Sequence, residues 1–224
     1  GRLKLGDAAF ALDPISSSGV EKAMRFSLQA AIAIHTFCHG DSVSQQSLAR
    51  EFYQQRLIET TARHHFWTAS YYQQAWCSES PFWRGRALSA PLLSSSSDNS
   101  GAEAMTDALQ REITRLAEYR EPELRQGPAI QMHQMIRFHH QVQIASTPCV
   151  TGDKVELLPA MRHPHLEHPL AFWENEALLP RIGILMQTAT LASVLGVLNQ
   201  SMNMQKAQRL LAWLWQRGLV EIAG

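Results

Sequence analysis

A short segment near the amino end of the chain has the residue types and spacing of a ligand-binding turn. Residues 6–20 read Gly-Asp-Ala-Ala-Phe-Ala-Leu-Asp-Pro-Ile-Ser-Ser-Ser-Gly-Val. The Asp7 carboxylate is an acceptor suited to a sugar-like hydroxyl, and the start of a helix offers backbone N–H groups to an electron-rich or anionic group. Glycine in that helix start lets the group approach closely. The candidate binding residues are Asp7, Asp13, Pro14, Ser18, Gly19 and Val20.

A strand end and a long helix are needed to position these residues. Residues 2–5 predict the last residues of a strand, which places Asp7 at the edge where open α/β sheets bind ligands. Pro14 fixes φ, the serines are suited to cap a helix, and an apolar helix is predicted from about Val20 to Phe37. An ordinary strand-to-helix turn with a serine cap is the alternative interpretation, and the residues alone leave it open.

The order of these short motifs resembles that of a known family. Gly-Asp-Ala-Ala, then Asp-Pro, then Ser-Ser-Gly-Val and an alanine-rich helix is similar to the last FAD-contact motif of flavin-dependent monooxygenases, in particular their tryptophan-halogenase-like branch. The resemblance implies FAD as cofactor, with Asp7 at the ribityl chain and residues 18–20 at the pyrimidine edge of the isoalloxazine. In halogenases the Ser-Gly step also lies beside the halide, which implies that role for Ser18 and Gly19. Residues 80–84, Ser-Pro-Phe-Trp-Arg, carry a second and less specific likeness.

The resemblance also implies a fold class and a place within a larger protein. We expect an α+β, mainly helical chain that forms the C-terminal part of a FAD-binding, Rossmann-type monooxygenase fold. The sequence has no G-x-G-x-x-G turn and begins without Met, so we expect the C-terminal half of a protein about twice this size, inactive on its own. The predicted domains are 1–88, the end of the FAD-binding domain; 89–102, a flexible loop; 103–177, a substrate or cap region; and 178–224, a winged-helix-like module.

Composition limits the class of partner and the compartment. Hydrophobic residues make up 45% of the chain, and 20 basic residues balance 20 acidic ones, so binding of nucleic acid by bulk charge is not expected. No apolar run approaches the ~20 residues that span a bilayer, so no membrane partner is expected. Cys38, Cys77 and Cys149 are odd in number and far apart, which favours reduced thiols that serve as packing residues in a cytoplasmic protein.

Two further helices are predicted within the first 120 residues. One runs from about Ser44 to Trp76 and the other from about Ala102 to Arg120. His64 and His65 lie in the first of these and could act as acid, base or hydrogen-bond donor, but no partner is identifiable, so a structural or exposed role is favoured. The helix predicted over 44–76 also carries an aromatic stripe, for which core packing is favoured. Its residues are Ile58, Ala62, Phe66, Ala69, Tyr72 and Trp76.

The next segment predicts mixed structure, a hairpin and a loop. Residues 129–144 predict strand or mixed structure, with methionines that either fill a core or line a substrate entrance. Val150–Leu158 predicts a hairpin that turns at Gly152-Asp153. His163, His165 and His168 lie close to Glu167, yet their spacing matches no common zinc pattern and the flanking prolines favour an extended, solvated loop. No metal is therefore expected.

The last residues predict two amphipathic helices and a short strand. The expected buried residues are Leu191, Val194, Leu195 and Leu198 in one helix and Ala207, Leu210, Leu211 and Leu214 in the other, and Gly218 ends the second. This order resembles a winged-helix module, including the type that grips substrate peptides in peptide-modifying enzymes. The few basic residues disfavour a DNA-reading role and favour a structural cap or a protein-docking unit.

Two classes of function remain open at this stage. The first is a flavin-dependent monooxygenase or halogenase-like oxidoreductase that acts on an electron-rich aromatic ring, such as a tryptophan that is free or part of a peptide or protein. The electrons for such an enzyme come from NAD(P)H on the same chain or from a separate flavin reductase. The alternative is a non-catalytic peptide- or protein-binding module with a winged-helix tail.

Overall fold

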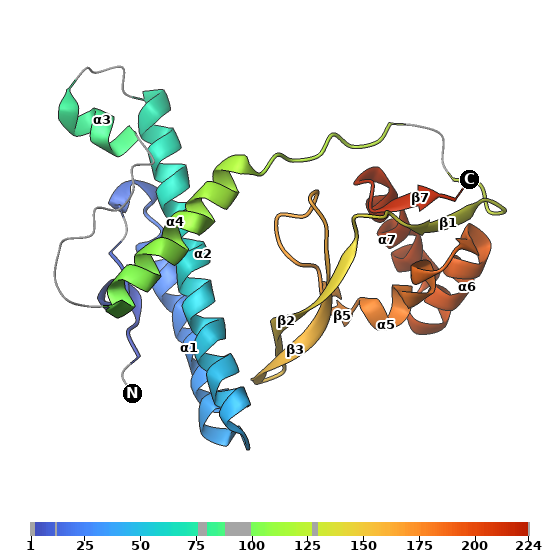
Figure 1. Cartoon of the computed structure of the whole chain (residues 1–224), viewed down its shortest axis with the longest axis horizontal. Helices are drawn as coiled ribbons and strands as arrows, with labels where there is room; N and C mark the ends of the chain where they lie inside the picture. Colours follow the sequence, from blue (N-terminus) through green and yellow to red (C-terminus); the bar gives the residue numbers. More distant parts are fainter. Residues whose placement is uncertain (1–2, 12, 76–79, 88–99, 127–129, 224) are drawn as a thin grey trace. The chain divides into compact units, whose positions relative to one another are not determined.

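The computed structural model describes residues 3–11, 13–75, 80–87, 100–126 and 130–223. The chain is mainly helical, with small antiparallel sheets (Figure 1). It divides into two compact units, each with its own core. Unit 1 is Gly1–Tyr119 with Val150–Glu156, and unit 2 is Arg120–Cys149 with Leu157–Gly224.

Unit 1 is built on two long helices that run side by side (Figure 1). Both follow the predicted helices closely, because their alanines and aromatic residues recur at helical spacing. The first ends at His39 and the second begins at Val43, so two separate helices form where two were predicted. The elements of the unit are the short 3-10 helices η1 (Gly6–Ala8) and η2 (Pro14–Ser16) and the helices α1 (Gly19–His39), α2 (Val43–Ala75), α3 (Pro81–Ala87) and α4 (Ser100–Glu118).

The core of unit 1 lies along α2. One cluster joins α1 and α2 through Phe26, Ala30, Ala33, Phe52 and Tyr53, and a second joins α2 and α4 through Ile58, Ala62, Leu109 and Ile113. Small alanines at these contacts let the helix backbones approach one another. Core packing is thus confirmed for the buried part of the predicted aromatic stripe, whereas Phe66 is half-buried and Trp76 lies outside the described residues.

The tip of a hairpin completes the core of unit 1. Val155 is buried in the cluster between α1 and α2, and its backbone N–H donates to Thr36 Oγ1 at 2.8 Å. The Thr36 hydroxyl in turn donates to the carbonyl of Ile32 at 2.9 Å. Gly152 has φ +63°, as the predicted turn requires. The hairpin is confirmed, with longer strands than expected: β2 (Gln143–Thr151) and β3 (Lys154–Arg162).

The predicted strand before Asp7 is not formed in the described part of the chain. Residues 3–5 are extended, with Leu5 at φ −130° and ψ 156°, but they pair with no described strand, and Arg2 lies outside the described residues. A strand needs a neighbour for its backbone hydrogen bonds, and sequence alone does not show whether one is near. Gly6, at φ +52°, turns the extended segment directly into η1.

Unit 2 packs helices against a three-stranded sheet whose order is β6-β1-β7. The eight apolar positions predicted for the last two helices are all buried, and Gly218 has φ +71° after the second of them. The central strand β1 precedes residue 178, so these helices share their core with earlier residues such as Ile136 and Phe138. The elements are β1 (Met135–Phe138), β4 (Phe172–Trp173), β5 (Glu176–Ala177), α5 (Leu179–Ile182), η3 (Gly183–Met186), β6 (Ala189–Thr190), α6 (Leu191–Ser201), α7 (Met204–Gln216) and β7 (Val220–Ile222).

Several sequence-based expectations end differently in the structure. Cys38 is exposed and Cys149 is half-buried, both as free thiols, so the packing interpretation is wrong for Cys38, and Cys77 lies outside the described residues. The predicted flexible loop falls mostly on residues 88–99, which are not described, and its last three residues begin α4. The winged-helix interpretation and the domain limits stay predictions.

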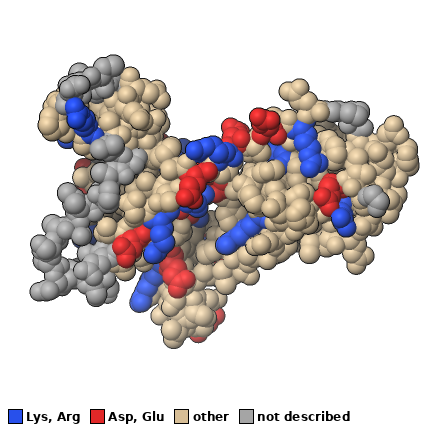
Figure 2. Space-filling model, turned by 45° about the horizontal axis from the view of Figure 1, so that its top comes forward, with Lys and Arg blue, Asp and Glu red and all other residues tan. Residues whose placement is uncertain are grey.

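The surface carries both charge signs, and the described helices are unsuited to a bilayer. Figure 2 shows basic and acidic side chains interspersed on the face in view, in keeping with the balance of 20 basic and 20 acidic residues. Among the described residues, no helix combines the length and the apolar character that crossing a membrane requires.

Gly40 at the end of α1 provides a test of this packing. A Cβ at that position would lie 2.8 Å from the carbonyl oxygen of Thr36 and 3.0 Å from Cβ of Gln45. We expect Gly40→Ala to lower the free energy of unfolding by about 1–3 kcal/mol through overpacking. The matched control is Gly85→Ala in α3, where an added Cβ meets nothing within 4 Å. Urea denaturation followed by circular dichroism measures both, and equal stability of the two variants would contradict the packing described for α1.

Candidate functional site

The segment that carries the predicted binding residues is held in place by side chains of α2. Tyr53 donates its hydroxyl to the carbonyl oxygen of Lys4 at 2.8 Å. Tyr72, near the carboxyl end of the helix, donates to Asp13 Oδ2 at 3.1 Å. Between them, His64 lies close enough to Asp13 for the carboxylate charge to act on its imidazole. One helix therefore contacts the segment before α1 at three heights along its length.

The Asp13 carboxylate connects this segment to α2 and α3. Its Oδ1 accepts the backbone N–H of Ile15 at 3.0 Å and so caps η2. The buried Tyr72 hydroxyl donates to this carboxylate, and the positive charge of Arg86 also acts on the hydroxyl. Burial, followed by the hydrogen bond and charge of Asp13, raises the pKa of Tyr72. Asp13 thus positions the backbone, and its side chain is engaged within the fold.

A lysine and a histidine form a second polar contact under the same segment. Lys22 Nζ lies 2.7 Å from His64 Nδ1, and Thr68 Oγ1 lies 3.4 Å from His64 Nε2. Burial lowers the pKa of Lys22, and burial together with the nearby Lys22 charge lowers the pKa of His64. We assign a neutral imidazole that accepts from the ammonium at Nδ1 and donates from Nε2.

The sequence did not reveal this contact. No partner of His64 was identifiable in the sequence, and a structural or exposed role was favoured. The structure shows a buried side chain that contacts Lys22 and Thr68. Lys22 is 42 positions away, and no local pattern links a lysine in one helix to a histidine in the next. His65 is half-buried and lies apart from this group.

The predicted binding residues differ in how far they reach solvent. Asp7 in η1 and Pro14, Gly19 and Val20 are exposed, whereas Asp13 and Ser18 are half-buried. Ser18 is the N-cap residue of α1 but its side chain makes no capping hydrogen bond to the helix, so the predicted serine cap is wrong. The capping carboxylate of Asp13 serves η2 instead, because the left-handed Ser17, at φ +50°, separates the two helices.

The beginning of α1 is an open surface. A Cβ added at Gly19 would meet no atom within 4 Å. Val20, Met24 and Leu28 follow at intervals of four residues and are all exposed, so they form an apolar stripe along one face of the helix. This face offers backbone N–H groups at the helix start and apolar side chains beside it.

Unit 2 holds a separate group of histidines. For three of them, His163, His165 and His168, the sequence predicted a solvated loop. His163 is only 6% exposed, so that interpretation is wrong for it. His163 Nδ1 accepts the backbone N–H of His165 at 3.0 Å, which leaves the proton on Nε2 to donate to His139 Nδ1 at 3.2 Å. His165 Nδ1 donates to the carbonyl oxygen of Arg217 at 2.7 Å. The flanking prolines predicted an extended segment over residues 163–168. They did not predict that His163 would contact His139, or that His165 would contact the backbone of Arg217.

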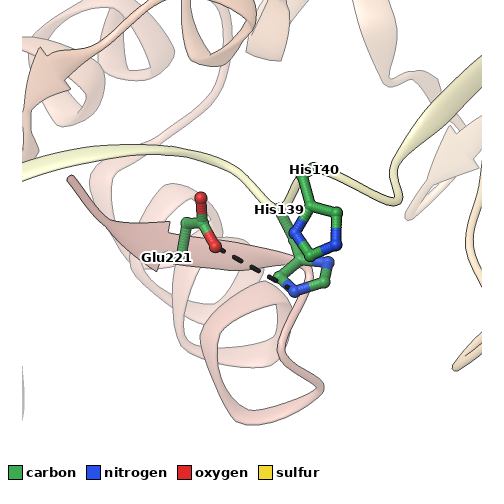
Figure 3. Close-up of side chains that lie close together, drawn as sticks. All are labelled: His139, His140 and Glu221. Atoms are coloured by element: carbon green, nitrogen blue, oxygen red, sulfur yellow. Dashed lines mark ion pairs between the residues drawn. The ribbon is translucent and has the colours of Figure 1, made fainter.

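Three side chains beside these histidines, His139, His140 and Glu221, have the chemistry of metal ligands. His139, His140 and Glu221 each offer one ligand atom, and these atoms lie within 4.8 Å of one another (Figure 3). His139 and His140 come from the turn after β1, and Glu221 lies on the neighbouring strand β7. His139 Nε2 and Glu221 Oε2 are 4.0 Å apart.

The hydrogen bonds around His139 oppose metal binding there. A metal on Nε2 would require the imidazole proton on Nδ1, where His163 Nε2–H and the backbone N–H of Gln141 both point. The other carboxylate oxygen of Glu221 accepts from Arg137 at 2.9 Å. The geometry favours a hydrogen-bonded series from His163 through His139 toward Glu221, and we assign no metal to it.

Comparisons with known proteins were made for the whole chain. No family model matches it, and no curated protein matches it. A solved peptidyl tryptophan dihydroxylase, QhpG, which is essential for tryptophylquinone cofactor biogenesis, aligns with a TM-score of 0.59 and 19% identity over 97% of this chain. The chain shares the fold of part of that enzyme. The flavin-dependent halogenase CmlS aligns with a TM-score of 0.46 and 16% identity over 96% of this chain. The chain covers 41% of the dihydroxylase and 43% of the halogenase.

The histidine series makes the stability of the chain sensitive to acid. Burial, and then the charges of neighbouring histidines, lowers the pKa of His163 to about 4, from an ordinary value near 6.5. Its neutral form is favoured in the fold, so the stability it contributes is complete above about pH 6.5 and is lost as the pH falls toward 4. We expect His163→Gln to reduce the slope of unfolding free energy against pH in this window. The reduction should correspond to at most one proton fewer in the difference in bound protons between the unfolded and the folded state.

Chemical denaturation at a series of pH values measures that slope. The matched control is His133→Gln, which removes a histidine that is exposed. An unchanged slope in His163→Gln would show that His163 takes up its proton in the folded state as readily as in the unfolded state.

Proposed function

We propose that this chain forms one wall of the FAD site of a flavin-dependent oxidoreductase that oxygenates or halogenates an electron-rich aromatic ring. The observation that carries the proposal is the Gly-Asp-Ala-Ala…Asp-Pro…Ser-Gly-Val segment, which ends at an exposed helix start. The fold shared with part of a tryptophan dihydroxylase supports it. Because the chain spans about two fifths of that enzyme, the proposal places the remaining flavin contacts on other parts of a longer polypeptide.

The residues present fit a flavin. The exposed Asp7 carboxylate can accept a hydrogen bond from a ribityl hydroxyl, and the open surface at Gly19 leaves room for a flat ring system. The backbone at residues 18–20 would face the electron-rich edge of that ring, where the positive end of the helix dipole stabilises negative charge. Bound flavin would supply the reaction with oxygen.

We propose a supporting role for Asp13 and Pro14. The Asp13 carboxylate is occupied by the Ile15 N–H and the Tyr72 hydroxyl, so it acts by fixing the backbone before α1. Lys22 and His64 lie beneath the same segment and add a positive charge on its inner side. We propose that these side chains position Ser18 and Gly19 for the flavin without contacting it.

The proposal leaves the ring that is modified open and includes a peptide among the substrates. The dihydroxylase that shares the fold acts on a peptidyl tryptophan, and an aromatic residue of a peptide or protein is the substrate class that we propose. A flavin reductase as a partner also stays a proposal. The alternative, a non-catalytic binding module with a winged-helix tail, is not favoured, because the solved structure that shares the fold is an enzyme.

Asp7→Ala tests the assignment of FAD to this segment. In the complete polypeptide that contains residues 1–224, we expect loss of one hydrogen bond of about 1–3 kcal/mol, which raises the dissociation constant of FAD roughly 5- to 150-fold. Titration of the purified protein with FAD, followed by flavin fluorescence, measures it. The matched control is Asp41→Ala, an exposed carboxylate beyond the other end of α1. Equal FAD affinity in Asp7→Ala and wild type would rule out the contact.

A further inference from the structure

Five aromatic rings follow one another across the end of α2 and the start of α3. Trp67 stacks on Tyr71 with ring centroids 5.8 Å apart and an interplanar angle of 26°. Tyr71 meets Tyr72 at 6.3 Å, and Tyr72 meets Trp83 at 5.7 Å. Phe82 packs edge-on against Trp83 at 4.7 Å. We call this series, Trp67, Tyr71, Tyr72, Phe82 and Trp83, the aromatic ladder.

Most of the ladder is at the surface. Trp67 is 47% exposed, Tyr71 45% and Phe82 56%, whereas Tyr72 is buried in the middle. Single exposed apolar side chains are common, but Trp67 and Tyr71 are both exposed and stack on each other, so they form an apolar patch of the kind that marks an interaction site. Aromatic rings are also the side chains that contribute most at binding surfaces, because they bury a large area and lose little conformational entropy.

The charges around the ladder favour an acidic partner. Residues 60–75 and 80–87 include Arg63, Arg84 and Arg86 but no aspartate or glutamate, and Glu79 lies outside the described residues. The carboxylate of Asp13 contacts the buried ring Tyr72, on the side of the ladder that faces the segment before α1. Arg86 lies 4.1 Å above the ring of Phe82, so a cation already lies against one exposed ring. Aromatic groups that enter such a surface gain from ring stacking and from cation–π contact, and carboxylates beside them gain from the arginines.

The ladder is also continuous with the segment before α1. Its buried member Tyr72 donates to Asp13 Oδ2 at 3.1 Å, so one hydroxyl joins the ladder to the Asp-Pro step. A partner bound on the ladder would therefore lie next to the segment to which we assign the flavin. This placement suits the residue that is to be modified, or the residues next to it.

We propose that the aromatic ladder is a docking site for a peptide or protein segment in which an aromatic side chain is flanked by acidic residues. The inference rests on the proposed function, because the docked segment would be the substrate of the proposed flavin site. The binding of the segment to the ladder does not itself depend on flavin. The aromatic side chain of the segment stacks on Trp67 and Tyr71. Its acidic neighbours lie toward the arginines.

Fluorescence anisotropy with defined peptides tests the proposal on the 224-residue chain. The probe is a fluorescein-labelled peptide Asp-Glu-Trp-Glu-Asp, and the comparison peptides replace its tryptophan by leucine or its acidic residues by lysines. We expect saturable binding that is at least tenfold weaker for each comparison peptide and that weakens as salt is added. Binding of the leucine peptide as tight as that of the tryptophan peptide would overturn the proposal, and so would the absence of binding.

Variants of the ladder locate the site. Trp67→Ala and Tyr71→Ala should each weaken binding of the tryptophan peptide at least tenfold, whereas Val43→Ala, at an exposed position at the start of α2, should not. Circular dichroism checks that each variant is folded, and Trp67→Leu replaces Trp67→Ala if the latter unfolds. Unchanged binding in the folded variants would overturn the proposal. Self-association of the wild-type chain that the variants lose would overturn it too, because a second copy would then cover the ladder.

The two proposals fail separately. Peptide binding without any FAD binding in the complete polypeptide would contradict the proposed function and leave the docking site intact. FAD binding with no peptide binding would contradict the docking site alone.

Discussion

The segment before α1 depends on hydrogen bonds from α2, because its own backbone forms only two short 3-10 turns. Tyr53, His64 and Tyr72 reach it from one helix and span roughly 28 Å at 1.5 Å per residue. Buried polar groups of this kind are costly to leave unpaired, so the positions of these three side chains restrict the path of the chain. The conformation at Gly6, Asp13 and Ser17 follows from this restraint.

The helices and turns could be predicted from the sequence, whereas the polar contacts could not. Apolar periodicity placed α1, α2 and α4 within a few residues, and glycines at 152 and 218 marked turns that need positive φ. The strand before Asp7 and the serine cap were wrong, because strand pairing and capping depend on which groups come near in space. The partnership of Lys22 with His64 and the burial of His163 are long-range contacts for the same reason.

The candidate site was predicted by type and only partly by geometry. The motif residues identified the exposed carboxylate of Asp7 and the open helix start at Gly19. They did not indicate that Asp13 is turned inward, or that its partner Tyr72 lies in the middle of a series of aromatic rings. Core packing was the favoured interpretation of the aromatic stripe, and it holds for Ile58, Ala62 and Tyr72. Trp67 follows the stripe residue Phe66 in the sequence and so lies off the face of the helix that the stripe occupies. Helical periodicity therefore gave it no role.

The central claim is that residues 6–20 form part of a flavin site, and a visible absorption spectrum tests it most directly. The complete polypeptide that contains this chain would be purified without added cofactor and then titrated with FAD. The account predicts the absorption bands of protein-bound flavin, either at once or as FAD is added, with saturation at one flavin per chain. A spectrum that remains that of free flavin throughout the titration would contradict the account.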